Sequence, residues 1–298
     1  MRTKMPGQKM KKMVGWLVVA AALVAARPAR ADELVIGIYA PTAGFASSSD
    51  RLSYVSALAK AIEGALGGGT TVKGQSFSSL SQMAGTAQFG ILDPLCAAGN
   101  KYTVMATATV NGKTEQTWAL YAKGASNLPA LKDKAVAYAK TGCNDQAFIE
   151  NALLESEVPA SFFKLSAKDA ITGAVTDVAS GGSQAVFAPP LGGTKGLTKL
   201  FDVGSVPNPA FVQLSSKVDA AVAAKVKAAV LGFAQRSALD GWKGAESYGS
   251  LAGRMGKRTK RPIFAPPQRI RLADPDVLEV AGVGAPATPD IKNHFWAP

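Results

Sequence analysis

Two cysteines are the residues of this chain whose types and spacing suggest chemistry most directly. Cys96 and Cys143 are its only cysteines, and each lies close to a carboxylate, Asp93 in one case and Asp145 in the other. Three interpretations of the pair are open. The sulfurs form a disulfide, or they remain free and partly buried thiols, or they join a carboxylate in a metal or redox site. The third interpretation lacks a histidine ligand and has poor ligand spacing.

The chain has a single histidine, which excludes most histidine-dependent catalysis. His294, near the end of the chain, is the only histidine, so the serine–aspartate pairs have no base to complete a hydrolase triad. The stretch 192–196 is rich in glycine but lacks the spacing of a P-loop, and we interpret it as a turn. We therefore expect a protein that is not an enzyme, with no catalytic residue, no cofactor and no metal site.

The first 31 residues have the three parts of a secretory signal. Basic residues come first, with no acidic residue before Asp32, and an apolar run follows over 13–25. Ala29-Arg30-Ala31 then offers the small residues that a signal peptidase requires. The run is shorter than the roughly 20 residues that cross a bilayer, which argues against an uncleaved anchor. We expect cleavage after Ala31 and a mature protein in the periplasm.

The charge of the mature chain excludes one large class of partners. The full chain carries a formal charge of +12, but the signal holds seven basic residues, which leaves 26 basic and 21 acidic residues, a net charge of +5. A nucleic-acid binder would need a basic surface spread over its fold, so we do not expect one. The basic, proline-rich segment 252–298 is predicted to be an extended tail, either solvated or in contact with a membrane surface or a protein partner.

Strand and helix patterns alternate in two sets that must position these residues. The turn Asn111-Gly112 joins two longer β segments, 102–110 and 116–121, between the sets. The first set has strands at 33–39, 71–73 and 89–92 with helices at 52–62 and 77–83. The second set has strands at 135–139, 161–165 and 184–187 with helices at 144–154 and 167–180, and β segments near 201–203 and 211–214 lead to a helix at 218–233.

This order predicts a mixed α/β protein with two lobes, each a mixed sheet flanked by helices. We expect the first lobe to comprise 32–113 and about 196–251, the second lobe 114–195, and a C-terminal extension 252–298. Ligands of open α/β sheets bind beyond the carboxyl ends of the strands. The expected site is therefore the cleft between the lobes.

Four stretches resemble the periplasmic solute-binding proteins of the phosphate/phosphite/phosphonate type. They are LVIGIYAPTAG, AQFGILDPLCAA, NGKTEQTWALYAK and LPALKDKAVAYAKTGCNDQAFIENALLESEV. The resemblance covers about residues 33–235 and rests on arrangement and short phrases. It implies the type II periplasmic-binding fold, capture of a small molecule by closure of the lobes, and delivery to an inner-membrane transporter.

The loop Thr141–Asp145 departs from that family in one respect. Relatives that hold a phosphoryl group present hydroxyls and free amides at the start of this helix, where the helix dipole favours an anion. Asp145 places a negative charge there, unless its side chain only caps its own helix. The neighbouring loops are mostly apolar, so a neutral, cationic or largely apolar ligand fits at least as well as a phosphate. The expected cleft contacts are Thr42, Asp93, Cys96, Gln116, Cys143, Asn144 and Pro190.

A second function belongs to another class. The same fold would serve as an accessory or interaction subunit of a periplasmic enzyme, sensor or lipid-transfer system. The basic tail, the apolar loops and a disulfide between lobes would favour it, because a covalent tie argues against an ordinary cycle of opening and closing.

Overall fold

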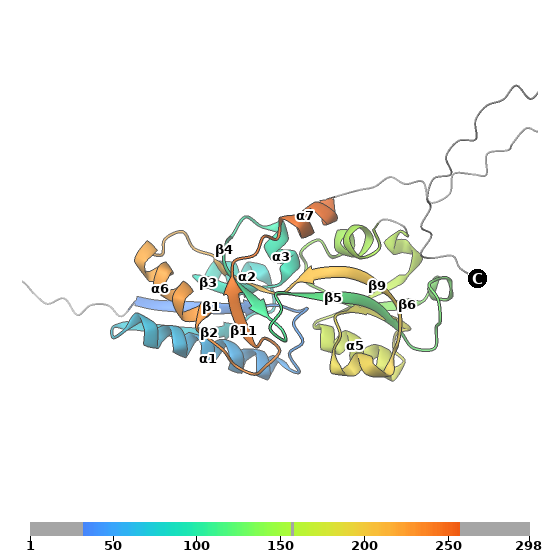
Figure 1. Ribbon diagram of the computed structural model, residues 1–298, viewed down its shortest axis with the longest axis horizontal. Coiled ribbons are helices and arrows are strands. Elements are labelled where there is room, and N and C mark those ends of the chain that lie inside the picture. Colours follow the sequence, from blue (N-terminus) through green and yellow to red (C-terminus); the bar gives the residue numbers. More distant parts are fainter. Residues whose placement is uncertain (1–31, 156–157, 257–298) are drawn as a thin grey trace, which may run out of the picture. The chain divides into compact units, whose positions relative to one another are not determined.

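The computed structural model describes residues 32–155 and 158–256. They form two lobes, each built on one mixed sheet flanked by helices, as Figure 1 shows. This confirms the expected two-lobed α/β fold. The predicted signal at 1–31 and most of the predicted tail, from 257 onward, lie outside the described residues. Within the described ranges, no helix is long and apolar enough to cross a membrane.

The first lobe has a six-stranded sheet in the order β2-β1-β3-β10-β4-β11. Strands β2, β1 and β3 are parallel, and β10 enters between β3 and β4 in the antiparallel sense. The strands are β1 (Asp32–Tyr39), β2 (Thr70–Ser76), β3 (Phe89–Leu92), β4 (Thr103–Thr109), β10 (Ala210–Gln213) and β11 (Gly241–Gly244).

Side chains of β1 are buried on both faces of this sheet. Ile36 and Ile38 belong to one apolar cluster, whereas Val35 and Tyr39 belong to another, as the alternation of a strand requires. Helices on each face complete the two clusters. They are α1 (Ser48–Leu66) and α6 (Ala220–Leu231) for the first cluster, and α2 (Leu80–Thr86) and α3 (Pro94–Gly99) for the second.

The second lobe repeats this plan with the order β7-β6-β8-β5-β9. Its parallel strands are β7, β6 and β8, and β5 pairs with β8 and β9 in the antiparallel sense. Its strands are β5 (Glu115–Ala122), β6 (Ala135–Ala139), β7 (Lys164–Lys168), β8 (Ala185–Ala188) and β9 (Thr198–Pro207). Its helices are η1 (Pro129–Leu131), α4 (Asp145–Ala147), η2 (Phe148–Leu153), η3 (Ala160–Phe162), α5 (Ile171–Ser180) and η4 (Gly192–Gly196).

The prediction that the chain returns to the first lobe at about residue 196 is wrong. Strand β9 is ten residues long and pairs with β5 from Glu115 to Ala122, so it belongs to the second sheet. The chain returns at Pro207-Asn208-Pro209. The helix expected over 144–154 is also divided, because α4 gives way to the π-helical segment η2.

The chain crosses between the lobes a third time after β11. Helix α7 (Gly249–Gly256) places Leu251 and Met255 in the apolar core of the second lobe. The amide of Asn151 donates to the Met255 carbonyl at 2.7 Å, and Arg254 donates to the Ser205 carbonyl at 2.6 Å. The beginning of the predicted tail is therefore a packed helix.

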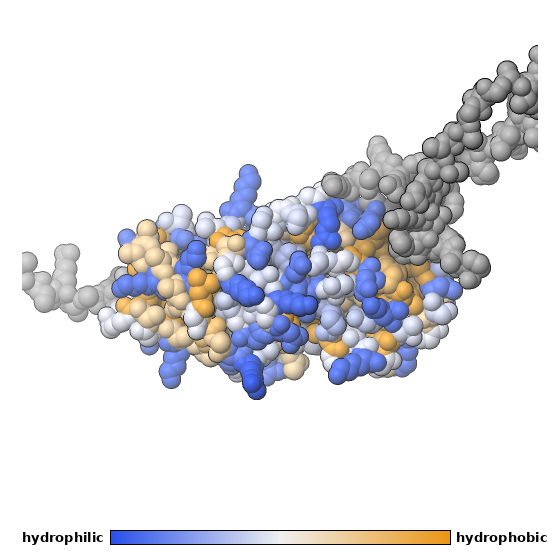
Figure 2. All heavy atoms as spheres, viewed as in Figure 1, coloured by the Kyte–Doolittle hydropathy of each residue, from blue (hydrophilic) through white to orange (hydrophobic). Residues whose placement is uncertain are grey.

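The surface in Figure 2 mixes polar and apolar side chains, with hydrophilic ones scattered over both lobes. Apolar colour gathers over α6, whose sequence is mostly alanine and valine and whose Leu231 is 39% exposed.

Candidate functional site

A disulfide joins the two lobes. Cys96 lies on α3 of the first lobe and Cys143 in the loop after β6 of the second, and their sulfurs are 2.04 Å apart with the Cα atoms 5.0 Å apart. This confirms the first of the three interpretations of the cysteines. The other two do not hold, because both sulfurs are used in the bond. We call Cys96, Cys143 and the adjoining loop Thr141–Asp145 the disulfide site.

Asp93 caps α3 beside the disulfide site. Its fully buried carboxylate accepts hydrogen bonds from the Thr42 hydroxyl at 2.6 Å, the Thr42 amide at 3.0 Å and the Leu95 amide at 3.1 Å. Burial raises the pKa of Asp93 to about 6, although these donors lower it. The residue fixes the loop after β1 onto the start of α3.

The carboxylate of Asp145 occupies the donors that an anion would use. It accepts from the Thr141 amide at 3.0 Å, from the Gly142 amide at 3.0 Å and from the Thr141 hydroxyl. The Cys143 amide in turn donates to the Thr141 hydroxyl at 3.1 Å. The interpretation that Asp145 only caps its own helix is therefore wrong: it closes the preceding loop on itself.

Direct hydrogen bonds also connect the lobes. The Tyr39 hydroxyl donates to the Thr141 carbonyl at 2.8 Å. Elsewhere the Ile171 amide donates to the Pro41 carbonyl at 2.9 Å, and the Thr172 hydroxyl donates to the Phe45 carbonyl at 3.1 Å. The lobes therefore touch through their own backbone and side chains.

Gly44 lies where two loops from different lobes come together. A Cβ atom at this position would stand 2.8 Å from the Leu191 side chain, which is closer than two carbon atoms pack. A larger residue here would push Leu191 aside.

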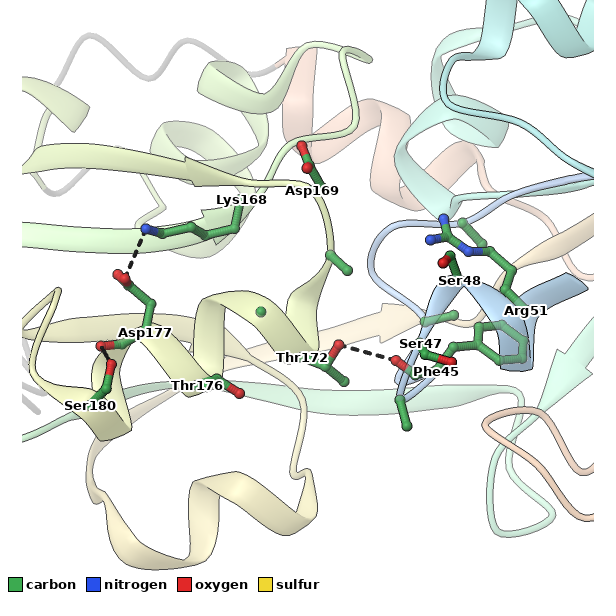
Figure 3. A pocket seen from close by; sticks show the side chains of 15 residues that line it. Phe45, Ser47, Ser48, Arg51, Lys168, Asp169, Thr172, Thr176, Asp177 and Ser180 are labelled. Atoms are coloured by element: carbon green, nitrogen blue, oxygen red, sulfur yellow. Dashed lines mark hydrogen bonds and ion pairs between the residues drawn. The ribbon is translucent and has the colours of Figure 1, made fainter.

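A cavity of about 560 Å³ lies between the beginnings of α1 and α5 (Figure 3). Ser48 and Arg51 come from the first lobe, and Lys168 and Asp169 come from the second, so each lobe supplies one wall. Lys168 forms an ion pair with Asp177 at 2.9 Å. Hydrogen bonds from Ser183 and Lys168 lower the pKa of Asp177. We call this space the Arg51–Asp169 cavity.

Arg51 and Asp169 have no ion-pair partner among residues 32–155 and 158–256. The Nε atom of Arg51 is buried and, within the same ranges, has no hydrogen-bond acceptor. Such unpaired groups differ from the Tyr39 hydroxyl and the Thr172 hydroxyl, which form hydrogen bonds to the opposite lobe.

A smaller cavity of about 200 Å³ adjoins the strands that cross between lobes. Thr42, Gln116 and Pro190 line it, and the Gln116 amide donates to the Asn208 side chain at 2.9 Å. That bond joins β5 to the segment Pro207-Asn208-Pro209. Gln116 therefore holds the crossing strands in place.

The seven expected cleft residues are divided among separate places. Thr42, Gln116 and Pro190 line the smaller cavity, while Cys143 and Asn144 line a third cavity of about 440 Å³ beside α7. Asp93 and Cys96 are fully buried. Sequence reasoning missed Arg51 and Asp169. Asp169 directly follows β7 at its carboxyl end, which is a signal that could have identified it, whereas Arg51 lies within α1 and carries no such signal.

Comparison with known proteins gives a likeness of fold alone. No family model and no curated protein matches the chain. The structure of XAC2383 from Xanthomonas citri bound to ATP aligns at 12% identity and a TM-score of 0.50, covering 75% of this chain and 94% of that one.

Two further structures align with lower scores. The alkanesulfonate-binding protein SsuA from Xanthomonas axonopodis pv. citri bound to MOPS has 18% identity and a TM-score of 0.44, covering 69% of this chain and 72% of that one. The amino acid ABC transporter substrate-binding protein AbpA from Streptococcus pneumoniae bound to L-arginine has 15% identity and a TM-score of 0.42, covering 66% and 86%.

Proposed function

We propose that this chain is an extracytoplasmic solute-binding protein that holds a small molecule between its two lobes. The observation that carries the proposal is the Arg51–Asp169 cavity. Its volume of about 560 Å³ falls within the roughly 300 to 1,000 Å³ of small-molecule sites. Both lobes line it, and each contributes a charged side chain without an ion-pair partner among the described residues.

Two features support a location outside the cytoplasm. The disulfide between Cys96 and Cys143 is typical of an oxidising compartment, and the first 31 residues have the pattern of a cleavable signal. Together they favour the periplasm.

A phosphoryl ligand at the disulfide site is not part of the proposal. The Asp145 carboxylate already accepts the hydrogen bonds that the Thr141 and Gly142 amides would give to an anion. XAC2383 binds ATP, but we do not propose that the loop Thr141–Asp145 of this chain binds a phosphate group.

Delivery to an inner-membrane transporter is the process that this binding would serve. A transporter distinguishes a loaded binding protein by the closure of its lobes. Neither cysteine lines the Arg51–Asp169 cavity, so a ligand reaches its wall residues without displacing the disulfide. We expect the disulfide to restrict closure to a small rotation.

Native mass spectrometry of the mature protein, purified from periplasm without reductant, tests the proposal. The expected intact mass is two hydrogens below the reduced value, with a small molecule retained. Arg51→Gln should release that molecule, whereas the exposed Arg236→Gln should keep it. A protein that retains no small molecule, and whose melting temperature responds to none in a metabolite panel, would refute the proposal.

The disulfide favours a second candidate, an accessory subunit with a fixed arrangement of lobes. Small-angle X-ray scattering distinguishes the two. A solute-binding protein should become more compact when the co-purified molecule is returned, and more so after reduction. An accessory subunit should keep one radius of gyration under all of these conditions.

A further inference from the structure

We propose that the Arg51–Asp169 cavity selects a zwitterion, a small molecule whose carboxylate pairs with Arg51 and whose ammonium group pairs with Asp169. This inference rests on the proposed function, because it names the class of solute for the same cavity. Three observations lead to it: the state of Arg51, the state of Asp169, and the neutralisation of the other charged groups in the walls.

Arg51 lacks an acceptor. It lies in the first turn of α1, and its buried Nε atom has no hydrogen-bond partner in the described part of the chain. A buried donor left unpaired costs about 1 to 3 kcal/mol. The neighbouring Asp50 carboxylate accepts from the Ser47 hydroxyl at 2.8 Å but not from the Nε atom of Arg51. A ligand carboxylate would accept two parallel hydrogen bonds from the guanidinium.

Asp169 lies on the other wall, between the end of β7 at Lys168 and the N-cap residue of α5, Ala170. Its side chain is exposed and, within residues 32–155 and 158–256, has neither a hydrogen-bond donor nor an ion-pair partner. Figure 3 shows Arg51 on the α1 side of the cavity and Asp169 on the α5 side. A cation held by Asp169 would lie across the cavity from Arg51.

The remaining charges in the walls cancel each other. Lys168 pairs with Asp177 at 2.9 Å, and Asp177 also accepts from the Ser183 hydroxyl at 2.6 Å. One positive and one negative group, on opposite lobes, are left for a ligand. A simple anion would face Asp169 without compensation, and a simple cation would face Arg51. A molecule with both charges satisfies both walls and links the two lobes.

Isothermal titration calorimetry on the oxidised mature protein tests the charge requirement. The probes are the free L-amino acids, their N-acetyl derivatives, which lack the cation, and the corresponding amines, which lack the carboxylate. Inorganic phosphate serves as a simple anion. At least one amino acid should bind, and its N-acetyl and amine counterparts should bind at least tenfold more weakly.

Two variants assign each charge to its wall. Arg51→Gln should weaken the amino acid and the N-acetyl derivative about tenfold or more but should not weaken the amine. Asp169→Asn should weaken the amino acid and the amine but should not weaken the N-acetyl derivative. Arg236→Gln and Asp202→Asn, which change exposed charges outside the cavity, should bind as the parent protein does. Melting temperatures of all variants check that each is folded.

The outcomes separate this inference from the proposed function. If phosphate, an amine or an N-acetyl derivative binds as tightly as every amino acid and Arg51→Gln alters that affinity, the zwitterion is wrong and solute binding stands. If amino acids bind but neither variant alters the affinity, the assignment to this cavity is wrong. If no probe binds and native mass spectrometry finds no retained molecule, both proposals fail.

Discussion

The disulfide site and the Arg51–Asp169 cavity lie on the same contact between lobes but satisfy their polar groups differently. At the disulfide site the protein supplies every partner: Asp145 accepts from Thr141 and Gly142, and Cys96 is bonded to Cys143. In the cavity, Arg51 and Asp169 face each other's lobe without an ion pair among the described residues. The first region holds the lobes together, and the second leaves room for a ligand.

The helix starts on the two sides of this comparison, α4 and α1, differ in which hydrogen-bond donors the protein leaves unpaired. The loop before α4 has the backbone of an anion site, but an internal carboxylate fills it. The start of α1 is capped by Ser47, whose hydroxyl accepts from the Asp50 amide, but the Nε atom of Arg51 beside it has no acceptor among the described residues. A ligand beside a helix start can use only those donors that the protein leaves unpaired.

The largest expected effect comes from removing the covalent tie. The cysteines are 47 residues apart, and a loop of that size corresponds to about 4 kcal/mol of stabilisation in the chain-entropy model. The double variant Cys96→Ala/Cys143→Ala should lose stability of that order in urea unfolding without reductant. Reductant should destabilise the parent protein to a similar extent and leave the double variant unaffected. Equal stabilities of the two oxidised proteins would contradict the role of the disulfide.

The next effect concerns pH and Asp93. Its pKa is raised from 3.8 to about 6 in the folded state, so the folded protein binds more protons than the unfolded chain between these values. Stability contributed by this group is therefore greatest below about pH 4 and falls as pH rises to about 6, by on the order of 3 kcal/mol. Urea unfolding from pH 4 to 7 should show this decline as the difference between the parent protein and Asp93→Asn.

A matched control distinguishes the effect of Asp93 on the pH dependence of stability from the effect of removing any other carboxylate. Asp202→Asn changes an exposed carboxylate and should not remove the decline that Asp93 causes. If Asp93→Asn and the parent protein have parallel pH curves, burial does not raise the pKa of Asp93 as described.

A smaller effect would turn the disulfide site into an anion site. Asp145→Ala removes the acceptor of three donors, two of them amides in the Thr141–Gly142 segment, and should cost about 1 to 3 kcal/mol. Sulfate or phosphate should then raise the melting temperature of the variant but not that of the parent protein. An unchanged stability with no response to either anion would show that Asp145 does not occupy these donors.

The smallest effect tests the cavity side of the contact. Thr172→Val keeps the shape of the side chain but removes its hydrogen bond to the Phe45 carbonyl, for a loss of about 1 kcal/mol. Thr176→Val, on the same helix, is the control, and urea unfolding measures both. Equal changes would mean that the bond between lobes does not contribute.

The fold could be predicted from sequence because its signals are local. Buried strands such as Phe89–Leu92 and the turn Asn111-Gly112 fix two α/β sets and the crossing between them. The limit of the second lobe could not be predicted, because Thr198–Pro207 reads as a strand without showing that its partner is β5.

The site was predicted less well than the fold. Cys96 and Cys143 were recognised as a pair because they are the only cysteines, yet their bond depends on a distance between two lobes. Asp145 was placed at the right loop, but its partners depend on the backbone that bends Thr141 toward it. Arg51 and Asp169 are 118 positions apart and carry no motif, so only the cavity that the beginnings of α1 and α5 line together reveals them as a pair.

The position of β10 has a consequence for how the protein is made. This strand fills the slot between β3 and β4, yet it comes from residues 210–213, after the whole of the second sheet. During synthesis, β3 and β4 are made before β10, so each has an unpaired edge at first. Such an edge can pair with another chain and lead to aggregation. The lobe that begins the sequence is thus the one whose sheet is completed last, and these two edges stay unpaired until β10 has been synthesised.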